Sequence, residues 1–419
     1  MAASQQDNTD SIFQRERLKR FNQTVWAILV GTFFMRFSYF MSWPFLIILL
    51  NSIHISPLKV GIMLGASAGI SSLSGFYIGY LSDRFGRRNI MVTGCGLAVL
   101  SYWALIIATQ FWQFFLIMLV LGLVRPMVEM VAKAVLSDHL PDSKDRELAF
   151  NLRYFAINIA GGIGALVGLY LALKNPNALF ISTSLAYLAY GFWLYRLLPP
   201  QSNDKTLSSQ NQSMQPHSTP SIIDAFKAIR HDTLFLLLIF AILLMLIVYS
   251  QVNVTLPQIL IQINATTVAH FIVMITVVNC LTVVFFQFPL LKIMENITVG
   301  IRTQIGFIMV LFSQMAFLFI DMHSLWAWST VIFILSLGEC IAFPNISVTI
   351  DSMAKPELRG SYFGAAMLGD FGSALGPIFG GMIIGQFSHQ SYFVFSTILS
   401  VLTVLIYHQI VRSQRTAQS

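Results

Sequence analysis

The chain has 419 residues, of which 56% are hydrophobic and only 10% are charged. This composition excludes a soluble globular protein and indicates a polytopic membrane protein. The formal net charge of +7 does not indicate nucleic-acid binding, because the basic residues gather in short segments between apolar runs. The three cysteines, Cys95, Cys280 and Cys340, lie in separate apolar runs and form no metal-binding or disulfide pattern. We therefore predict neither a metal site nor a cofactor.

Apolar runs follow one another along the whole chain. Each is about as long as the ~20 helical residues that cross a hydrocarbon core. The predicted fold class is therefore an all-α membrane protein with 12 transmembrane helices in two six-helix repeats. The predicted spans are residues 24–50, 59–81, 89–110, 111–136, 148–173, 178–198, 233–256, 268–291, 301–320, 325–350, 361–386 and 392–410.

A polar interval rich in Ser, Gln and Asn separates the sixth and seventh spans and is too hydrophilic to form a core. Basic residues concentrate in the segments on the same side as both tails, and only Lys59 and Lys174 lie on the other side. By the positive-inside rule both termini face the cytoplasm, as in an integral multi-pass protein of the bacterial inner membrane. The predicted domains are residues 1–23 (cytoplasmic tail), 24–198 (first bundle), 199–232 (cytoplasmic linker), 233–410 (second bundle) and 411–419 (tail).

A short charged loop joins the second and third spans. Its motif residues are Gly79, Asp83, Arg84, Gly86, Arg87 and Arg88. This pattern, Gly-x-x-x-Asp-Arg-x-Gly-Arg-Arg, resembles the loop between helices two and three of the major facilitator superfamily. The resemblance implies two six-helix bundles with a substrate cavity between them, and a secondary transporter that works by alternating access.

The loop also has a predicted mechanical role. Gly79 removes a side chain where helix two approaches helix eleven, whose first turn contains Gly360. Asp83 would then face the N-terminus of helix eleven, where backbone N–H groups carry partial positive charge. Arg84 is within reach of Asp138 at the end of helix four. The resemblance implies that the loop acid and its arginines bridge the two halves when the cavity faces outward.

A simpler interpretation applies to part of the same loop. Arg87 and Arg88 are equally consistent with anchors on anionic lipid that only fix the topology. For Asp83 the gating role is favoured.

The two halves carry similar glycine-rich segments. Residues 158–168 resemble residues 370–380, which lie half a chain later, so helix eleven is predicted to repeat helix five. Helix eleven also matches a glycine-proline pattern that resembles the drug:proton antiporter branch, where it is expected on helix five. Small residues of this kind predict close helix packing. The packing residues are Gly164 and Gly168 on helix five, and Gly372, Gly376, Pro377, Gly380 and Gly381 on helix eleven.

Six ionisable residues within the predicted spans are candidates for a functional role: Arg36, Arg125, Glu129, Lys133, Glu339 and Asp370. Each costs ~2.5–3.5 kcal/mol at the bilayer centre, so we expect them to face the protein interior or a water-filled cavity. Three are basic and three acidic, which permits complete pairing. Arg125, Glu129 and Lys133 recur every fourth residue and therefore form one stripe on helix four. Lys133 lies near the inner surface, where a role as an anchor is favoured.

The stripe on helix four carries a second resemblance. Arg125, with Leu121 before it, matches the helix-four pattern Leu-x-x-x-Arg of the antiporters, but Glu129 replaces the glycine expected next. Glu129 paired with Arg125 or Arg36 acts either as a fixed counter-ion or, when a substrate displaces the pair, as a proton carrier. The residues alone leave these two roles open.

Two acids of the second half complete the candidate site. Asp370 has no cation on its own helix and is the second candidate proton carrier. The alternative role for Asp370 is a structural acid that fixes helix eleven against helix two. Glu339 lies in the middle of helix ten, which lines the cavity in similar transporters, and is a candidate for recognising a cationic substrate.

The sequence contains no phosphate-binding Gly-x-x-x-x-Gly-Lys-Ser/Thr loop, which argues against ATP-driven pumping, and we predict no enzymatic activity. Buried charges of mixed sign also argue against a simple channel. The partners we expect are a small-molecule substrate, protons and the lipid bilayer, with no nucleic acid, and the chain is expected to act as a monomer.

The favoured function is proton-coupled efflux of a small amphipathic or cationic compound, either a drug, as in multidrug resistance, or an exported metabolite such as a siderophore. The loop motif, Arg125 and the buried acids favour this antiport. The degenerate glycine pattern of helix five favours the alternative, which is proton-coupled uptake of a nutrient or metabolite. A transporter-like sensor is a third alternative, disfavoured by the short loops.

Overall fold

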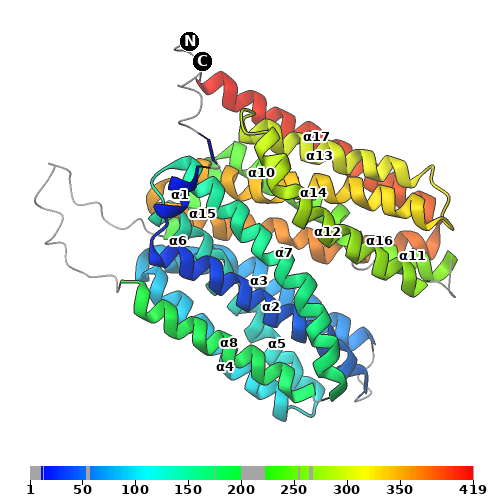
Figure 1. Ribbon diagram of the computed structural model, residues 1–419, viewed down its shortest axis with the longest axis horizontal. Helices are drawn as coiled ribbons and strands as arrows, with labels where there is room; N and C mark the ends of the chain where they lie inside the picture. Colours follow the sequence, from blue (N-terminus) through cyan, green and yellow to red (C-terminus); the bar gives the residue numbers. More distant parts are fainter. Residues whose placement is uncertain are drawn as a thin grey trace, which may run out of the picture.

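The computed structural model describes residues 11–418 except residues 13, 53–56, 175, 200–221, 253–254 and 264–267. The described chain forms two helical bundles, one from α2 to α8 and the other from α10 to α17 (Figure 1). Residues 1–10 of the predicted N-terminal tail and most of the predicted linker lie outside the described residues.

The first bundle consists of six membrane-length rods, preceded by the short helix α1 (Arg15–Lys19). Its fourth rod is built from three consecutive segments. The elements are α2 (Gln23–Ser52), α3 (Pro57–Phe85), α4 (Arg87–Ile107), α5 (Phe111–Arg125), η1 (Pro126–Met130), α6 (Val131–His139), α7 (Ser143–Lys174) and α8 (Pro176–Leu197).

The second bundle follows the amphipathic helix α9 (Ile222–His231), whose Ala225 and Ile229 are buried. Its first and fifth rods are again segmented. The elements are α10 (Thr233–Tyr249), η2 (Ser250–Val252), α11 (Thr255–Ile263), α12 (Val268–Ile293), α13 (Val299–Phe317), α14 (Leu325–Met353), η3 (Pro356–Leu358), α15 (Arg359–Ala366), η4 (Met367–Asp370), α16 (Phe371–Gln386) and α17 (His389–Gln418).

The predicted fold class is confirmed. Within the described residues, 11 helices are long and apolar enough to cross a membrane, and α7, with 32 residues, has the length of a further span. Helices are expected here because lipid offers no hydrogen-bond partners, so each span has to satisfy its own backbone groups.

Three rods are interrupted, which the sequence analysis did not predict. The fourth contains the π-helical turn η1, the seventh the 3-10 turn η2, and the eleventh the 3-10 turn η4. Pro126 begins η1 and has no N–H to donate to the preceding turn, which accounts for the widened helix at this point. Two of the interruptions coincide with candidate site residues, because Glu129 lies in η1 and Asp370 ends η4.

Glycines bring α16 close to the first rod of the second half. A Cβ atom on Gly376 would lie 2.5 Å from the carbonyl oxygen of Ile247, and Gly372 and Gly380 lie against the same rod. Gly381 has no neighbour within 4 Å of such an atom among the described residues. The packing role predicted for Gly381 is therefore wrong, because it lies one position away from the glycine face at residues 372, 376 and 380.

The glycines of helix five have a different neighbour. A Cβ atom on Gly164 would lie 2.6 Å from the carbonyl oxygen of Phe37 on α2, so Gly164 lets α7 approach α2 closely. Gly168 is buried on the same helix. Pro377 lies inside α16.

The two bundles contact each other mainly through α3 and α7 of the first bundle. Helix α3 packs against α15, and α7 packs against α12 and α14. In the repeat, helix two corresponds to helix eight and helix five to helix eleven, so the two contacts are related by the pseudo-symmetry. Both described chain ends lie at the end of the molecule that contains Asp83, since Ile12 contacts Glu295 and Val411 lies beside Gly300. We call this end the Asp83 end.

Candidate functional site

Asp83 joins the two halves through the first turn of α15. Its carboxylate accepts hydrogen bonds from the backbone N–H groups of Gly360 at 3.0 Å and Ser361 at 2.8 Å, and from the Ser361 hydroxyl at 2.8 Å. These amides begin a helix and have no partner within it, so a carboxylate is stabilised there by both hydrogen bonds and the helix dipole. This is the position that the sequence analysis predicted for Asp83.

Glycines allow the backbones of α3 and α15 to touch. A Cβ atom on Gly79 would overlap the carbonyl group of Gly360, and one on Gly75 would lie 2.7 Å from the carbonyl oxygen of Gly364. Gly86, between α3 and α4, has φ of 92°, a backbone conformation that side-chain-bearing residues rarely adopt. The glycines of the loop motif therefore have a steric basis in this structure.

Arg87 is the arginine that connects the loop acid to helix four. Its guanidinium group lies 2.6 Å from Asp83 and 3.1 Å from Asp138. The predicted contact between Arg84 and Asp138 is wrong: Arg84 is exposed and donates to the Tyr80 hydroxyl at 3.2 Å. Residue 84 lies a quarter turn from residue 83 on the helix and points away from α15, whereas residue 87 lies one turn on.

Asp138 is shared between the halves. Arg359, at the start of α15, lies 3.3 Å from the Asp138 carboxylate and also donates to the carbonyl oxygen of Ser137. Arg88 takes no part in this network, because its guanidinium group lies 4.0 Å from the centre of the Tyr195 ring.

A second set of ion pairs crosses between the bundles at the Asp83 end. Arg146 on α7 lies 2.5 Å from Asp351 on α14, and Arg359 lies 3.4 Å from the same carboxylate. Glu147 on α7 pairs with Arg302 on α13, and both side chains are less than 10% exposed. These residues were not predicted from the sequence, because they lie at span ends and belong to no recognised motif.

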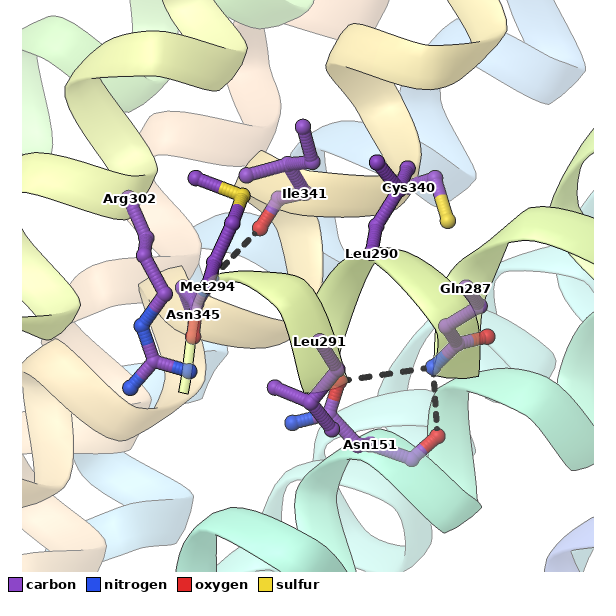
Figure 2. A pocket seen from close by; sticks show the side chains of 9 residues that line it. All are labelled: Asn151, Gln287, Leu290, Leu291, Met294, Arg302, Cys340, Ile341 and Asn345. Carbon is purple, nitrogen blue, oxygen red and sulfur yellow. Dashed lines mark hydrogen bonds between the residues drawn. The ribbon is translucent and has the colours of Figure 1, made fainter. Parts of the chain in front are cut away.

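A small cavity lies beside this second set. Gln287 on α12 donates to the backbone carbonyl of Asn151 on α7 at 2.8 Å, so the wall of the cavity joins the two halves (Figure 2). The lining residues are Asn151, Gln287, Leu290, Leu291, Met294, Arg302, Cys340, Ile341 and Asn345.

The segment before α2, residues 11–20, contacts the second half through Glu295 and Lys292. The Glu295 carboxylate accepts a hydrogen bond from the backbone N–H of Ile12, which is 1% exposed. Lys292 pairs with Glu295 at 2.7 Å and donates to the Ser11 hydroxyl at 3.1 Å. Burial alone opposes ionisation of Glu295, but the hydrogen bonds from Lys292 and from this segment outweigh it and lower its pKa.

The same segment contacts the first half through Arg17. The buried guanidinium group lies 2.6 Å from Asp145 and 2.9 Å from Asp142, at the start of α7. Burial opposes ionisation of Asp142, but backbone hydrogen bonds and the hydrogen bond from Arg17 lower the pKa of its carboxyl group. Residues 11–20 thus bind both halves, and we call them the N-terminal strap.

A charged cluster lies away from this end, where the interrupted rods meet. Arg36 on α2 pairs with Glu129 on η1. Arg125 lies 3.9 Å from Glu129 and 2.8 Å from Asp370, which belongs to the second half. Asp370 was predicted to have no cation on its own helix. In the structure its cation, Arg125, comes from the opposite bundle.

Arg153 on α7 also belongs to the cluster and was missed, although it lies within the predicted span 148–173. It interacts electrostatically with Glu129 and with the neighbouring cations Arg36 and Arg125. The expected complete pairing of three bases with three acids is therefore wrong, because a further buried base is present. The signal was available in the sequence as a charged residue inside an apolar run.

Glu339 lies apart from the cations. The Tyr154 hydroxyl on α7 donates to its carboxylate at 2.6 Å, and the Asn279 side chain on α12 donates at 2.6 Å. Glu339 is 4% exposed. It links the halves through neutral donors rather than through an ion pair.

Two bundles of membrane-spanning helices, joined at one end by ion pairs and with a charged cluster between them, are the architecture of a secondary transporter. A family model of the Major Facilitator Superfamily matches residues 28–370. The chain therefore belongs to the Major Facilitator Superfamily of membrane transporters.

Individual relatives agree with this assignment. The uncharacterized MFS-type transporter YqjV of Bacillus subtilis (strain 168) is 32% identical over 384 residues, which cover 91% of each chain. A Na(+), Li(+), K(+)/H(+) antiporter of Planococcus maritimus is 23% identical and covers 90% of this chain and 96% of its own. The crystal structure of the human organic anion transporter MFSD10 matches with a TM-score of 0.75 and 15% identity, over 94% of this chain and 100% of the other. This last likeness concerns the fold alone.

Proposed function

We propose that this protein is a proton-coupled secondary transporter in which the ion pair between Arg125 and Asp370 links coupling to the movement of the two halves. The pair joins helix four of the first bundle to helix eleven of the second at 2.8 Å. Protonation of Asp370, or a substrate that competes for Arg125, would remove a charged contact between the bundles. Glu129, held by Arg36 and close to Arg125, is the second candidate proton carrier.

The contacts at the Asp83 end form the gate of this proposal. With the orientation expected from the positive-inside rule, both termini and the Asp83 end face the cytoplasm, and the structure is a state closed on that side. Opening requires Asp83 to leave the first turn of α15, and Arg359 and Arg146 to lose carboxylates of the opposite half. The two bundles of one chain supply all of these contacts, which supports a monomeric transporter.

Efflux of a small amphipathic compound in exchange for protons is the favoured direction. The Planococcus relative is named as an antiporter of Na(+), Li(+) and K(+) against H(+), which supports antiport as the mode. Proton-coupled uptake remains the second candidate, because the same coupling residues serve symport when substrate and proton bind together. The location expected for either is the bacterial inner membrane.

The test is transport by the purified protein in proteoliposomes with an imposed pH gradient and a panel of amphipathic compounds. Glu129→Gln and Asp370→Asn should each abolish gradient-driven transport, whereas Asp321→Asn, in the loop after α13, should leave it unchanged. Full gradient-driven transport by both coupling variants would refute proton coupling through these acids. Wild-type movement of substrate in the same direction as the protons would replace antiport by symport.

A further inference from the structure

The charged cluster contains more positive than negative groups. Four cations interact electrostatically with Glu129: Arg36, Arg125, Lys133 and Arg153. The second carboxylate within reach of this set is Asp370, which pairs with Arg125 and interacts with Lys133. Four bases against two acids leave an excess of two positive charges. Glu339 does not compensate them, because its partners are neutral hydroxyl and amide groups.

Arg153 carries much of this excess. Arg153 is 6% exposed, it forms no salt bridge with any of the described residues, and its Nε atom has no hydrogen-bond partner among them. A buried guanidinium group without a counter-ion is costly, because desolvation is not repaid by a pair. The charged cluster therefore has fewer negative groups than its buried cations need as counter-charges.

The cluster is also accessible from the interface between the bundles. The Arg125 side chain is 46% exposed and that of Asp370 is 23% exposed, although their ion pair joins two transmembrane rods. Aromatic rings border the cluster from both halves: the Arg36 guanidinium lies 5.8 Å from the Tyr39 ring centre, and the Lys133 ammonium 5.9 Å from that of Phe363. The environment thus offers positive charge next to flat apolar surface.

We propose that the cargo is an organic anion, with a carboxylate or similar acidic head bound by the cations of the cluster and an apolar body against the aromatic rings. This inference rests on the proposed transport function and names its substrate class. It revises the amphipathic or cationic compound expected from the sequence in one respect, since a cation would enter a site that already has excess positive charge. An anion instead supplies the counter-charge that Arg153 lacks, and by competing with Asp370 for Arg125 it can loosen the contact between the halves.

The test is binding to the full-length protein in detergent, measured by thermal unfolding and tryptophan fluorescence. Three probes share one aromatic body and differ in charge: 1-naphthoate, 1-naphthamide and 1-naphthylmethylammonium. Wild type should bind naphthoate at least about tenfold more tightly than either other probe. Arg153→Gln should weaken naphthoate binding at least about tenfold, as expected for loss of a buried charged partner. Arg153→Lys should retain most of the affinity, and Arg196→Gln, on the surface of α8, all of it.

Each other outcome would overturn the inference. Equal binding of naphthoate and naphthamide would show that the charge excess recruits no anionic head. Tighter binding of the ammonium probe would indicate a cation site. Chloride that binds while naphthoate does not would indicate an inorganic counter-ion. No proton gradient is present in detergent, so this binding experiment does not depend on proton coupling. A failure of the coupling experiment would therefore leave the anion site standing, and a failure of anion binding would leave proton coupling standing.

Discussion

At the scale of single residues, the loop motif divides into groups with different roles. Asp83 and Arg87 form a pair whose partners lie on α15 and α6, while Arg84 and Arg88 contact aromatic residues of their own half. The motif therefore contains one buried charge network and two exposed or stacked arginines. The sequence pattern presents the arginines as equivalent, and only the direction of each side chain from the helix separates them.

We expect Arg87→Gln to open the gate far more than Arg84→Gln. Removing Arg87 leaves Asp83 and Asp138 without their shared cation, and breaking a buried pair costs about 3–5 kcal/mol. Cys340 lines the cavity at the Asp83 end and is 3% exposed, so its labelling by a permeant maleimide reports gate opening. In a background with Cys95→Ser and Cys280→Ser, Arg87→Gln should speed labelling at least about tenfold, while Arg84→Gln should match the background. Equal labelling of both variants would contradict the assignment.

At the scale of elements, the sequence predicted the rods and their order but not where three of them are interrupted. Periodicity and length are local properties, so the spans and the Asp83 contact, which combines a loop acid with a helix N-terminus, were accessible. The ion pair between Arg125 and Asp370 could not be predicted from the sequence, because it joins residues of opposite bundles. Nothing in the sequence of either helix identifies the partner. Pro126 and Arg153 are intermediate cases. A proline and a charged residue inside apolar runs are visible in the sequence, but a prediction based on the length of each span takes no account of them.

The N-terminal strap is an element whose attachment should depend on pH. Glu295 and Asp142 have lowered pKa values in the folded protein, so their contribution to attachment is complete above the ordinary carboxyl pKa and is lost as the pH falls through the lowered values. The protection of the Ile12 amide against hydrogen exchange should therefore be constant near neutral pH and should fall below about pH 4.

A matched pair of variants separates this effect from general acid unfolding. Glu295→Gln should lower the protection of Ile12 at neutral pH, where the wild-type carboxylate is fully ionised. Glu357→Gln, at an exposed acid of η3, should leave it unchanged. Protection that is insensitive to both acid and Glu295→Gln would show that the apolar burial of Ile12 alone holds the strap.

At the scale of the whole molecule, the ion pairs between the halves are distributed unevenly. Among the described residues, those that join the bundles are Arg125 with Asp370 in the charged cluster and, at the Asp83 end, Arg146 with Asp351, Arg302 with Glu147, and Arg359 with Asp138. The Asp83 end is thus held by several charged contacts that must break together when it opens. Alternating access then requires that the free energy of substrate or proton binding at the charged cluster offset the loss of these ion pairs.

Linking the halves at the Asp83 end should stop transport without preventing substrate binding. Cysteines at positions 138 and 359, introduced as Asp138→Cys and Arg359→Cys in a chain with its three native cysteines replaced by serine, place one thiol in each half. A short cleavable bis-maleimide should abolish transport in proteoliposomes, and cleavage of the linker should restore the rate of the unlinked variant. A second pair, Asp321→Cys with His323→Cys, lies within one loop of the second half, and its linkage should leave transport unchanged. Continued transport by the first linked pair would mean that the two bundles do not separate at this end, and that the contacts of Asp83, Arg87 and Arg359 are a permanent clasp.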